Sequence, residues 1–156
     1  MVKKYDYIKL GKWLYDGARG YSPIDWAVIN IEDTRSLLLC RHALVKCGDR
    51  NTPHLVAWFN SNFINCFTPQ EKQRIDGDIF LLSAKEIRTY LPEPFQRECK
   101  IYNPILNEFV PAHYWLRTEE IQPFNDYVNS TGDIKEGEFY TLGDEKGARP
   151  ALWLKH

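Results

Sequence analysis

The chain has no segment typical of an exported or membrane-bound protein. Residues 1–6 carry two lysines, but no apolar run follows them, so a secretory signal is not expected. No run approaches the roughly 18 apolar residues that a bilayer-spanning helix needs. We therefore expect a cytoplasmic protein, in a bacterial cell or a phage-infected host, without a membrane partner.

Cysteine is also scarce, with four residues and no CxxC pair, so free thiols are expected. The one cluster of thiols and imidazoles comprises Cys40, His42, Cys47 and His54. Its spacing matches no zinc pattern closely, and Cys40 falls in a strand that is expected to enter the core. Structural roles are favoured here, while zinc binding and catalysis stay open as alternatives.

Other catalytic patterns are missing as well. Ser83 follows a strand and begins a helix, but it lacks the flanking glycines of a nucleophile elbow, so a helix-capping role is expected. The segment 17–20 lacks the Lys-Ser/Thr pair of a phosphate-binding loop. Six to eight convergent oxygen ligands for calcium cannot be assembled. No catalytic residue, metal or cofactor is predicted, and an enzyme with an unrecognised site remains one alternative.

Aromatic residues, by contrast, are abundant. They make up 14% of the 156 residues, and apolar residues make up 44%. Each aromatic side chain buries a large area, and two half-length domains would each have a marginal core, so one domain over residues 1–156 is expected. Four of the five tryptophans are predicted to anchor this core: Trp26, Trp58, Trp115 and Trp153.

The first half predicts strands that lead into helices. Residues 5–10 are predicted to form a strand that Gly11 interrupts. An apolar, β-branched run at 24–31 and a leucine-rich run at 36–40 flank a short polar turn and predict a hairpin. A further short buried strand is expected at 78–82.

Three helix starts carry clear signals. Thr52 precedes a proline, and two segments beginning at Thr68 and Ser83 have the Ser/Thr-x-x-Glu pattern of a capping box. The first of these helices carries apolar residues at i, i+4 spacing that must face a core. This stripe consists of Leu55, Phe59, Phe63 and Phe67.

After Pro92 the sequence predicts few strands and long loops. The strand candidates are 112–117, 126–129 and 151–155, and surface loops are expected at 118–125 and 135–147. Long ordered loops on a packed scaffold often carry binding sites.

Charge is uneven although the net charge is only −1. Residues 1–20 hold five basic and two acidic residues, a net charge of +3, whereas 119–147 holds eight acidic and two basic residues, a net charge of −6. Such an acidic segment repels nucleic acid and attracts a basic surface. We therefore expect a protein partner with a basic surface and no nucleic-acid partner.

Seven short motifs in order resemble a widespread bacterial family known only as a domain of unknown function. They cover nearly the whole chain from about residue 8, and their order and rough spacing agree. The motifs are WAVI at 26–29, SLLL at 36–39, WFNSNF at 58–63, FLLS at 80–83, YWLR at 114–117, YVNSTG at 127–132 and GARPALWL at 147–154.

The last motif is also similar to the end of C-type-lectin-like domains, such as formylglycine-generating-enzyme-type domains and the variable proteins of diversity-generating retroelements. The resemblance implies a C-type-lectin-like α+β fold with small mixed or antiparallel sheets and two to three helices. It also implies paired N- and C-terminal strands and a loop-rich second half that presents a ligand surface. Formylglycine-type oxygenase chemistry is not expected, because no cysteine follows Cys99.

Arg149 in the last motif needs a partner if it is buried, because an uncompensated internal charge is costly. The candidates for its counter-ion are Asp25 and Glu71.

The predicted recognition surface lies in the second half, where aromatic, acidic and amide residues alternate as in protein-binding rims. Its residues are Arg117, Glu119, Glu120, Asn125, Tyr127, Asn129, Asp133, Glu136 and Tyr140, with Phe124 and Phe139 beside them. The leading hypothesis is a non-catalytic module that binds a protein partner, specifically a phage- or mobile-element-encoded inhibitor of a host defence factor. The alternatives are a small-molecule or carbohydrate binder and an enzyme.

Overall fold

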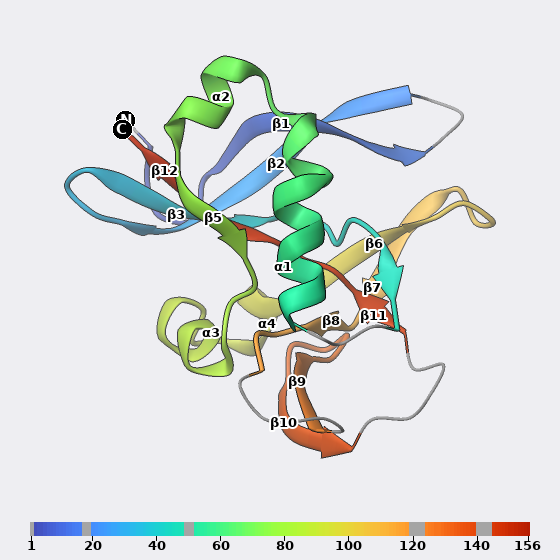
Figure 1. Cartoon of the computed structure of the whole chain (residues 1–156). Coiled ribbons are helices and arrows are strands. Elements are labelled where there is room, and N and C mark those ends of the chain that lie inside the picture. The colour runs from blue at the N-terminus through green and yellow to red at the C-terminus, as the bar shows by residue number, and fades with distance from the viewer. Residues whose placement is uncertain (1, 17–19, 49–51, 119–123, 140–144) are drawn as a thin grey trace.

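The computed structural model describes residues 2–16, 20–48, 52–118, 124–139 and 145–156. Within them the chain is an α+β protein with four α-helices, one 3₁₀ helix and small, mostly antiparallel sheets (Figure 1). In this part of the chain no helix is long and apolar enough to cross a membrane. The α+β class is confirmed, with one helix more than predicted.

The central sheet has five antiparallel strands. Their order is β1 (Tyr7–Asp16), β2 (Gly20–Ile31), β3 (Arg35–Cys40), β12 (Ala151–Lys155) and β5 (Ile75–Phe80). The predicted hairpin is the β2–β3 pair. The predicted buried strand 78–82 corresponds to β5, but β5 begins at Ile75, ends at Phe80 and is buried only at Ile79.

Both faces of the central sheet are buried in its middle. Along β3, Leu38 and Cys40 face one hydrophobic core, whereas Leu37 and Leu39 face a second core on the opposite side. This explains the uninterrupted apolar run in β3, because successive side chains of a strand point to opposite faces and here both faces are buried.

The prediction that the first and last strands pair with each other is wrong. β2 and β3 lie between β1 and β12, and β12 is inserted between β3 and β5. The reason is burial: apolar β12 pairs with apolar β3, whereas β1 is exposed or half-buried except at Leu10 and Gly11 and suits an edge. The two ends of the chain still lie side by side (Figure 1), and Val2 and His156 line the same hollow.

β1 also continues through Gly11, where a break was predicted. The register to β2 shifts between Lys9 and Lys12, and Gly11 has a φ of +73° at this bulge. Its N–H donates to Glu71 Oε2 over 3.0 Å, and a Cβ there would lie 3.0 Å from the Phe67 ring. Glycine therefore bends the strand instead of ending it.

One face of the central sheet is covered by α1 (Thr52–Ser61) and η1 (Phe63–Cys66), as Figure 1 shows. The predicted stripe is buried there, although the α-helix ends before Phe63 and the chain tightens into η1. Trp26 is fully buried in this core, and Trp58 packs against it half-exposed. Trp115 is buried in the same core, and Trp153 packs half-exposed against the other one.

The other helices begin as their capping residues predict. In α2 (Pro69–Arg74), the Thr68 side chain and Glu71 form a complete capping box, and in α3 (Ala84–Tyr90) Ser83 and Glu86 do the same. Ser83 is thus a helix cap, as expected. The fourth helix, α4 (Pro94–Arg97), spans only four residues, which is too short for periodicity to reveal.

The second half contains more strands than predicted. β6 (Cys99–Asn103) and β7 (Glu108–Ala112) form a hairpin, and a second sheet has the order β10 (Ile134–Phe139), β9 (Phe124–Val128), β8 (Tyr114–Trp115), β11 (Lys146–Gly147) and β4 (Lys46–Cys47). The expected loop 135–147 is therefore wrong over β10 and β11. These strands lack the alternation of apolar and polar residues that predicts a strand, because β10 contains charged residues and Gly137 and β7 contains Pro111.

Gly132 fixes how the β9–β10 turn meets α4, and this gives a stability prediction. Gly132 has a φ of +85°, and a Cβ there would lie 2.0 Å from the Pro94 carbonyl oxygen. Gly77 in β5 has a similar φ of +80° with nothing within 4 Å, so it is a matched control. In urea unfolding, Gly77→Ala should cost about 1 kcal/mol through backbone strain, and Gly132→Ala at least about 2 kcal/mol more through the clash. Equal losses would contradict this packing.

Candidate functional site

Three of the nine predicted recognition residues, Glu119, Glu120 and Tyr140, lie outside the described residues. Phe124 and Phe139 are backbone partners in the β9–β10 pair. The other six predicted residues lie on or beside the second sheet.

Arg117 and Glu136 line one hollow of about 740 Å³, together with Asp126 and the first turns of α3. Both are held by partners within the chain. Arg117 bonds Glu86 over 2.6 Å and the Leu81 carbonyl over 3.1 Å, and Glu136 pairs with Arg88. These contacts dock α3 onto the second sheet.

The remaining four predicted residues support the second sheet. Asn125 is only 3% exposed, and Tyr127 packs half-buried with the Lys146 ammonium 4.3 Å from its ring centre. Asn129 and Asp133 close the β9–β10 turn, where Asn129 Oδ1 accepts from the Asp133 N–H over 2.9 Å. The structure thus brings Arg117 and Glu136 to one hollow and gives the other four mainly structural contacts.

Arg149 has neither of its predicted counter-ions. Asp25 instead bonds Lys9 over 2.7 Å and Arg41 over 3.3 Å, and Glu71 caps α2. Arg149 is 5% exposed and donates to the carbonyl oxygens of Cys40 over 2.7 Å and of Arg41 and Arg97 over 3.4 Å each.

These three bonds use three of the five N–H groups of the guanidinium. Its carbon lies 4.8 Å from the centre of the Tyr114 ring. Backbone carbonyls and a ring face stabilise the cation through dipoles, and no carboxylate among the described residues neutralises it.

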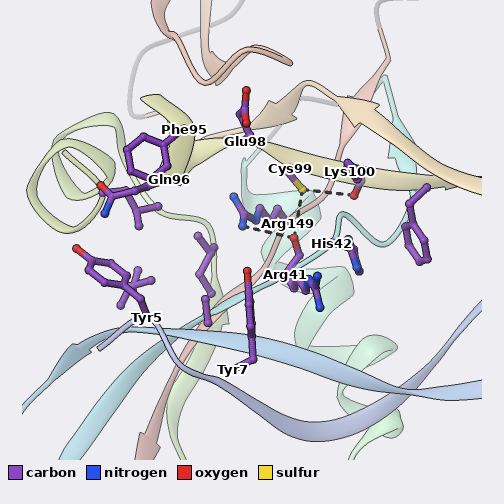
Figure 2. Close-up of a pocket in the computed structure, with 15 residues that line it drawn as sticks. Tyr5, Tyr7, Arg41, His42, Phe95, Gln96, Glu98, Cys99, Lys100 and Arg149 are labelled. Carbon is purple, nitrogen blue, oxygen red and sulfur yellow. Dashed lines mark hydrogen bonds between the residues drawn. The ribbon is translucent and has the colours of Figure 1, made fainter. Parts of the chain in front are cut away.

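Arg149 lines a cavity of about 730 Å³ that lies between the central sheet and the α4–β6 segment. The face of the central sheet contributes Ala27, Ile29 and Leu39. Figure 2 shows Arg149 between Tyr5 and Tyr7 on one wall and the segment from Phe95 to Lys100 on the other. The volume is in the range of small-molecule sites, and the lining joins apolar surface to a few polar groups.

Positive charge dominates this cavity. Arg41 and Lys100 line it with Arg149, and Glu98 is the acidic residue in the lining. Arg41 stacks on the Tyr7 ring, with 4.6 Å from its guanidinium carbon to the ring centre, and this fixes one cation at the wall.

His42 lies in the same wall, stacked on Phe109 with 4.1 Å between ring centres. Burial, together with the positive charges of Arg41 and Arg149, lowers the pKa of His42 from 6.5 to about 4. Its Nδ1 is buried and has no hydrogen-bond partner among the residues that the structure describes. A neutral imidazole in this position matches a site whose potential is already positive.

The cysteine and histidine cluster of the sequence does not converge. Cys40 is buried behind the cavity, whereas His54 is exposed on α1. All four cysteines are free thiols, and burial raises the pKa of Cys40 to about 12. In the described part of the chain, no three His, Cys, Asp or Glu residues are placed to hold a metal ion.

The thiol of Cys99, which lines the cavity, has a pKa raised by burial and stays protonated at neutral pH. The arrangement can therefore hold an anion but does not activate this thiol as a nucleophile. Sequence reasoning identified Arg149 as a residue in need of a partner. It missed the cavity, whose residues come from positions as distant as Tyr5 and Arg149.

The environment of His42 can be tested by NMR titration of the four histidines, with His42→Gln identifying the His42 signal. The imidazole should remain neutral at pH 5.5 and titrate near pH 4. Because unfolded His42 binds a proton near pH 6.5, acidification between these values should destabilise the folded state through this residue. A midpoint at or above 6.5 would contradict both its burial and the positive potential.

Comparisons with known proteins leave the family open. No model of a known protein family matches the chain, and searches of curated proteins and of solved structures find no match either. The resemblance to the bacterial family and to the C-type-lectin-like fold therefore stays a prediction from the seven motifs.

Proposed function

We propose that this domain is a non-catalytic binding module that takes up a small organic anion in the cavity around Arg149. The observation that carries the proposal is the buried guanidinium itself. It lines the cavity, it is solvated by carbonyl groups, and no described carboxylate neutralises it. A buried, unneutralised charge is costly, and an anion in the cavity would offset that cost.

Geometry supports the same proposal. The three carbonyl bonds leave one N–H on each Nη of Arg149, and these donors suit the oxygens of a carboxylate or phosphate. Lys100 and Arg41 stand at the same cavity, so that the anion is attracted before it reaches Arg149. The first 20 residues carry a net charge of +3. Lys9 from this segment pairs with Asp25, the carboxylate that also bonds Arg41, and so offsets the charge of Asp25 near the cavity.

The predicted protein-binding surface of the second half is supported less well. Its acidic residue Glu136 already pairs with Arg88, and Arg117 pairs with Glu86. Recognition of a basic protein by this surface, and an inhibitor of a host defence factor as its specific form, remain predictions. A neutral carbohydrate would leave the cationic groups of the cavity without a counter-charge.

A thermal-shift screen of carboxylates, sulfonates and phosphate esters, with neutral sugars alongside, tests the proposal. One or more classes of anion should raise Tm in a concentration-dependent way, because a ligand that binds only the folded state stabilises it. The neutral sugars should have no effect. A panel in which no anion raises Tm, or in which neutral sugars act as strongly, would contradict the proposal.

Single substitutions then locate the site. Calorimetry with the best anion should show about tenfold weaker binding for Lys100→Ala and for Arg41→Ala, since each removes a charge-assisted contact. Lys72→Ala, on exposed α2 outside the cavity, is the matched control and should bind like the wild type. Wild-type affinity in both cavity variants would place the anion elsewhere.

A further inference from the structure

The mouth of the cavity is lined by aromatic side chains from opposite walls. Tyr5 and Tyr7 come from the N-terminal segment, and Phe95 comes from α4 (Figure 2). All three are substantially exposed, with Tyr5 at 42%, Tyr7 at 55% and Phe95 at 71%. Exposed aromatic faces gathered around one opening form a surface on which a flat ring can stack.

Tyr5 is held in a backbone conformation that a bulky residue rarely adopts. Its φ is +73°, in the left-handed region, and such strain persists only where neighbouring contacts impose it. Here the Tyr5 N–H donates to the Val28 carbonyl over 2.6 Å, and the Lys3 N–H donates to Asp6 Oδ2 over 2.9 Å. The Tyr5 hydroxyl donates to the Tyr90 carbonyl over 3.0 Å.

These bonds fix the Tyr5 ring at the cavity mouth and connect the N-terminal segment to α3. A position that is strained, exposed and fixed at a cavity is typical of a residue that contacts a ligand. Burial in the core does not account for a tyrosine at this strained position, since 42% of the Tyr5 surface is open to solvent.

The polar groups further specify the ligand. Three cations line the cavity: Arg41, Lys100 and Arg149. Among the described residues, Arg41 forms an ion pair with a carboxylate, that of Asp25. This excess of positive charge suits a phosphate, which carries up to two negative charges, better than a single carboxylate. Gln96 Oε1 accepts from the Glu93 N–H over 3.0 Å, which directs the Gln96 oxygen to the helix end and leaves its NH₂ group as a donor beside the mouth.

Resting on the proposed function, we infer that the bound anion is a nucleotide. Its phosphate lies against Arg149, Arg41 and Lys100. Its base stacks between the aromatic side chains of Tyr5 and Phe95, with the Gln96 amide near the base edge. This arrangement uses both the charge and the exposed rings, which neither a sugar phosphate nor a nucleoside would do.

Calorimetry with dissected ligands tests this inference. The probes are the four common nucleoside 5′-monophosphates, their nucleosides, ribose 5-phosphate and benzoate. At least one nucleotide should bind about tenfold or more tightly than its nucleoside and than ribose 5-phosphate, because each part adds its own contacts. Benzoate should bind more weakly than that nucleotide.

Variants at the mouth separate stacking from charge. Tyr5→Gly removes the ring while allowing the positive φ, and Phe95→Ala removes the facing ring. Each should weaken nucleotide binding about tenfold and leave ribose 5-phosphate binding unchanged. Tyr21→Ala is the matched control, because Tyr21 is an aromatic residue that is 66% exposed and does not line the cavity.

The outcomes distinguish the two proposals. If ribose 5-phosphate or benzoate binds as tightly as every nucleotide, or if both ring variants bind like the wild type, the nucleotide inference is wrong and the anion site stands. If nucleosides bind as tightly as nucleotides, the anion site itself is contradicted. If another class of anion binds and no nucleotide does, only the nucleotide inference falls.

Discussion

The guanidinium of Arg149 joins three parts of the chain that are distant in sequence. Its donors reach the carbonyls of Cys40 and Arg41 at the end of β3 and of Arg97 at the end of α4. Its carbon lies over the ring of Tyr114 in β8, whose hydroxyl also donates to the Arg97 carbonyl over 2.7 Å. The central sheet, the short helix and the second sheet thus converge on one buried cation.

The same cation shapes the cavity. The Cys40 N–H donates to the Pro150 carbonyl over 3.0 Å, and the Arg149 side chain donates to the Cys40 carbonyl. Both the backbone and the side chain of the segment that carries Arg149 are thus bonded to the end of β3. With its backbone fixed, Arg149 stays at the cavity instead of turning toward solvent. A preorganised charge of this kind lowers the cost of binding, because the protein does not have to reorganise when an anion arrives.

Local signals in the sequence predicted local structure well. The capping residues Thr68 and Ser83 and the apolar stripe of the first long helix were identified, because caps and helical periodicity depend only on neighbouring residues. The β2–β3 hairpin followed from two apolar runs around a short turn. Strand order was not accessible in this way, since the pairing of β12 with β3 and β5 is set by burial across the whole chain.

The site was less accessible still. Arg149 was recognised as a residue that needs a partner, but its partners are backbone carbonyls, which every residue carries and no sequence pattern marks. The exposed rings of Tyr5 and Phe95 line one cavity only because the fold places the N-terminal segment and α4 on its opposite walls. Nothing in the residues around Tyr5 indicated that its backbone would adopt a positive φ.

Anomalous diffraction from crystals soaked in bromide tests directly whether the Arg149 cavity is an anion site, without knowledge of the natural ligand. A strong bromide peak is expected inside the cavity, in contact with the Arg149 guanidinium. Bromide bound at exposed lysines on the surface, with none in the cavity, would contradict it.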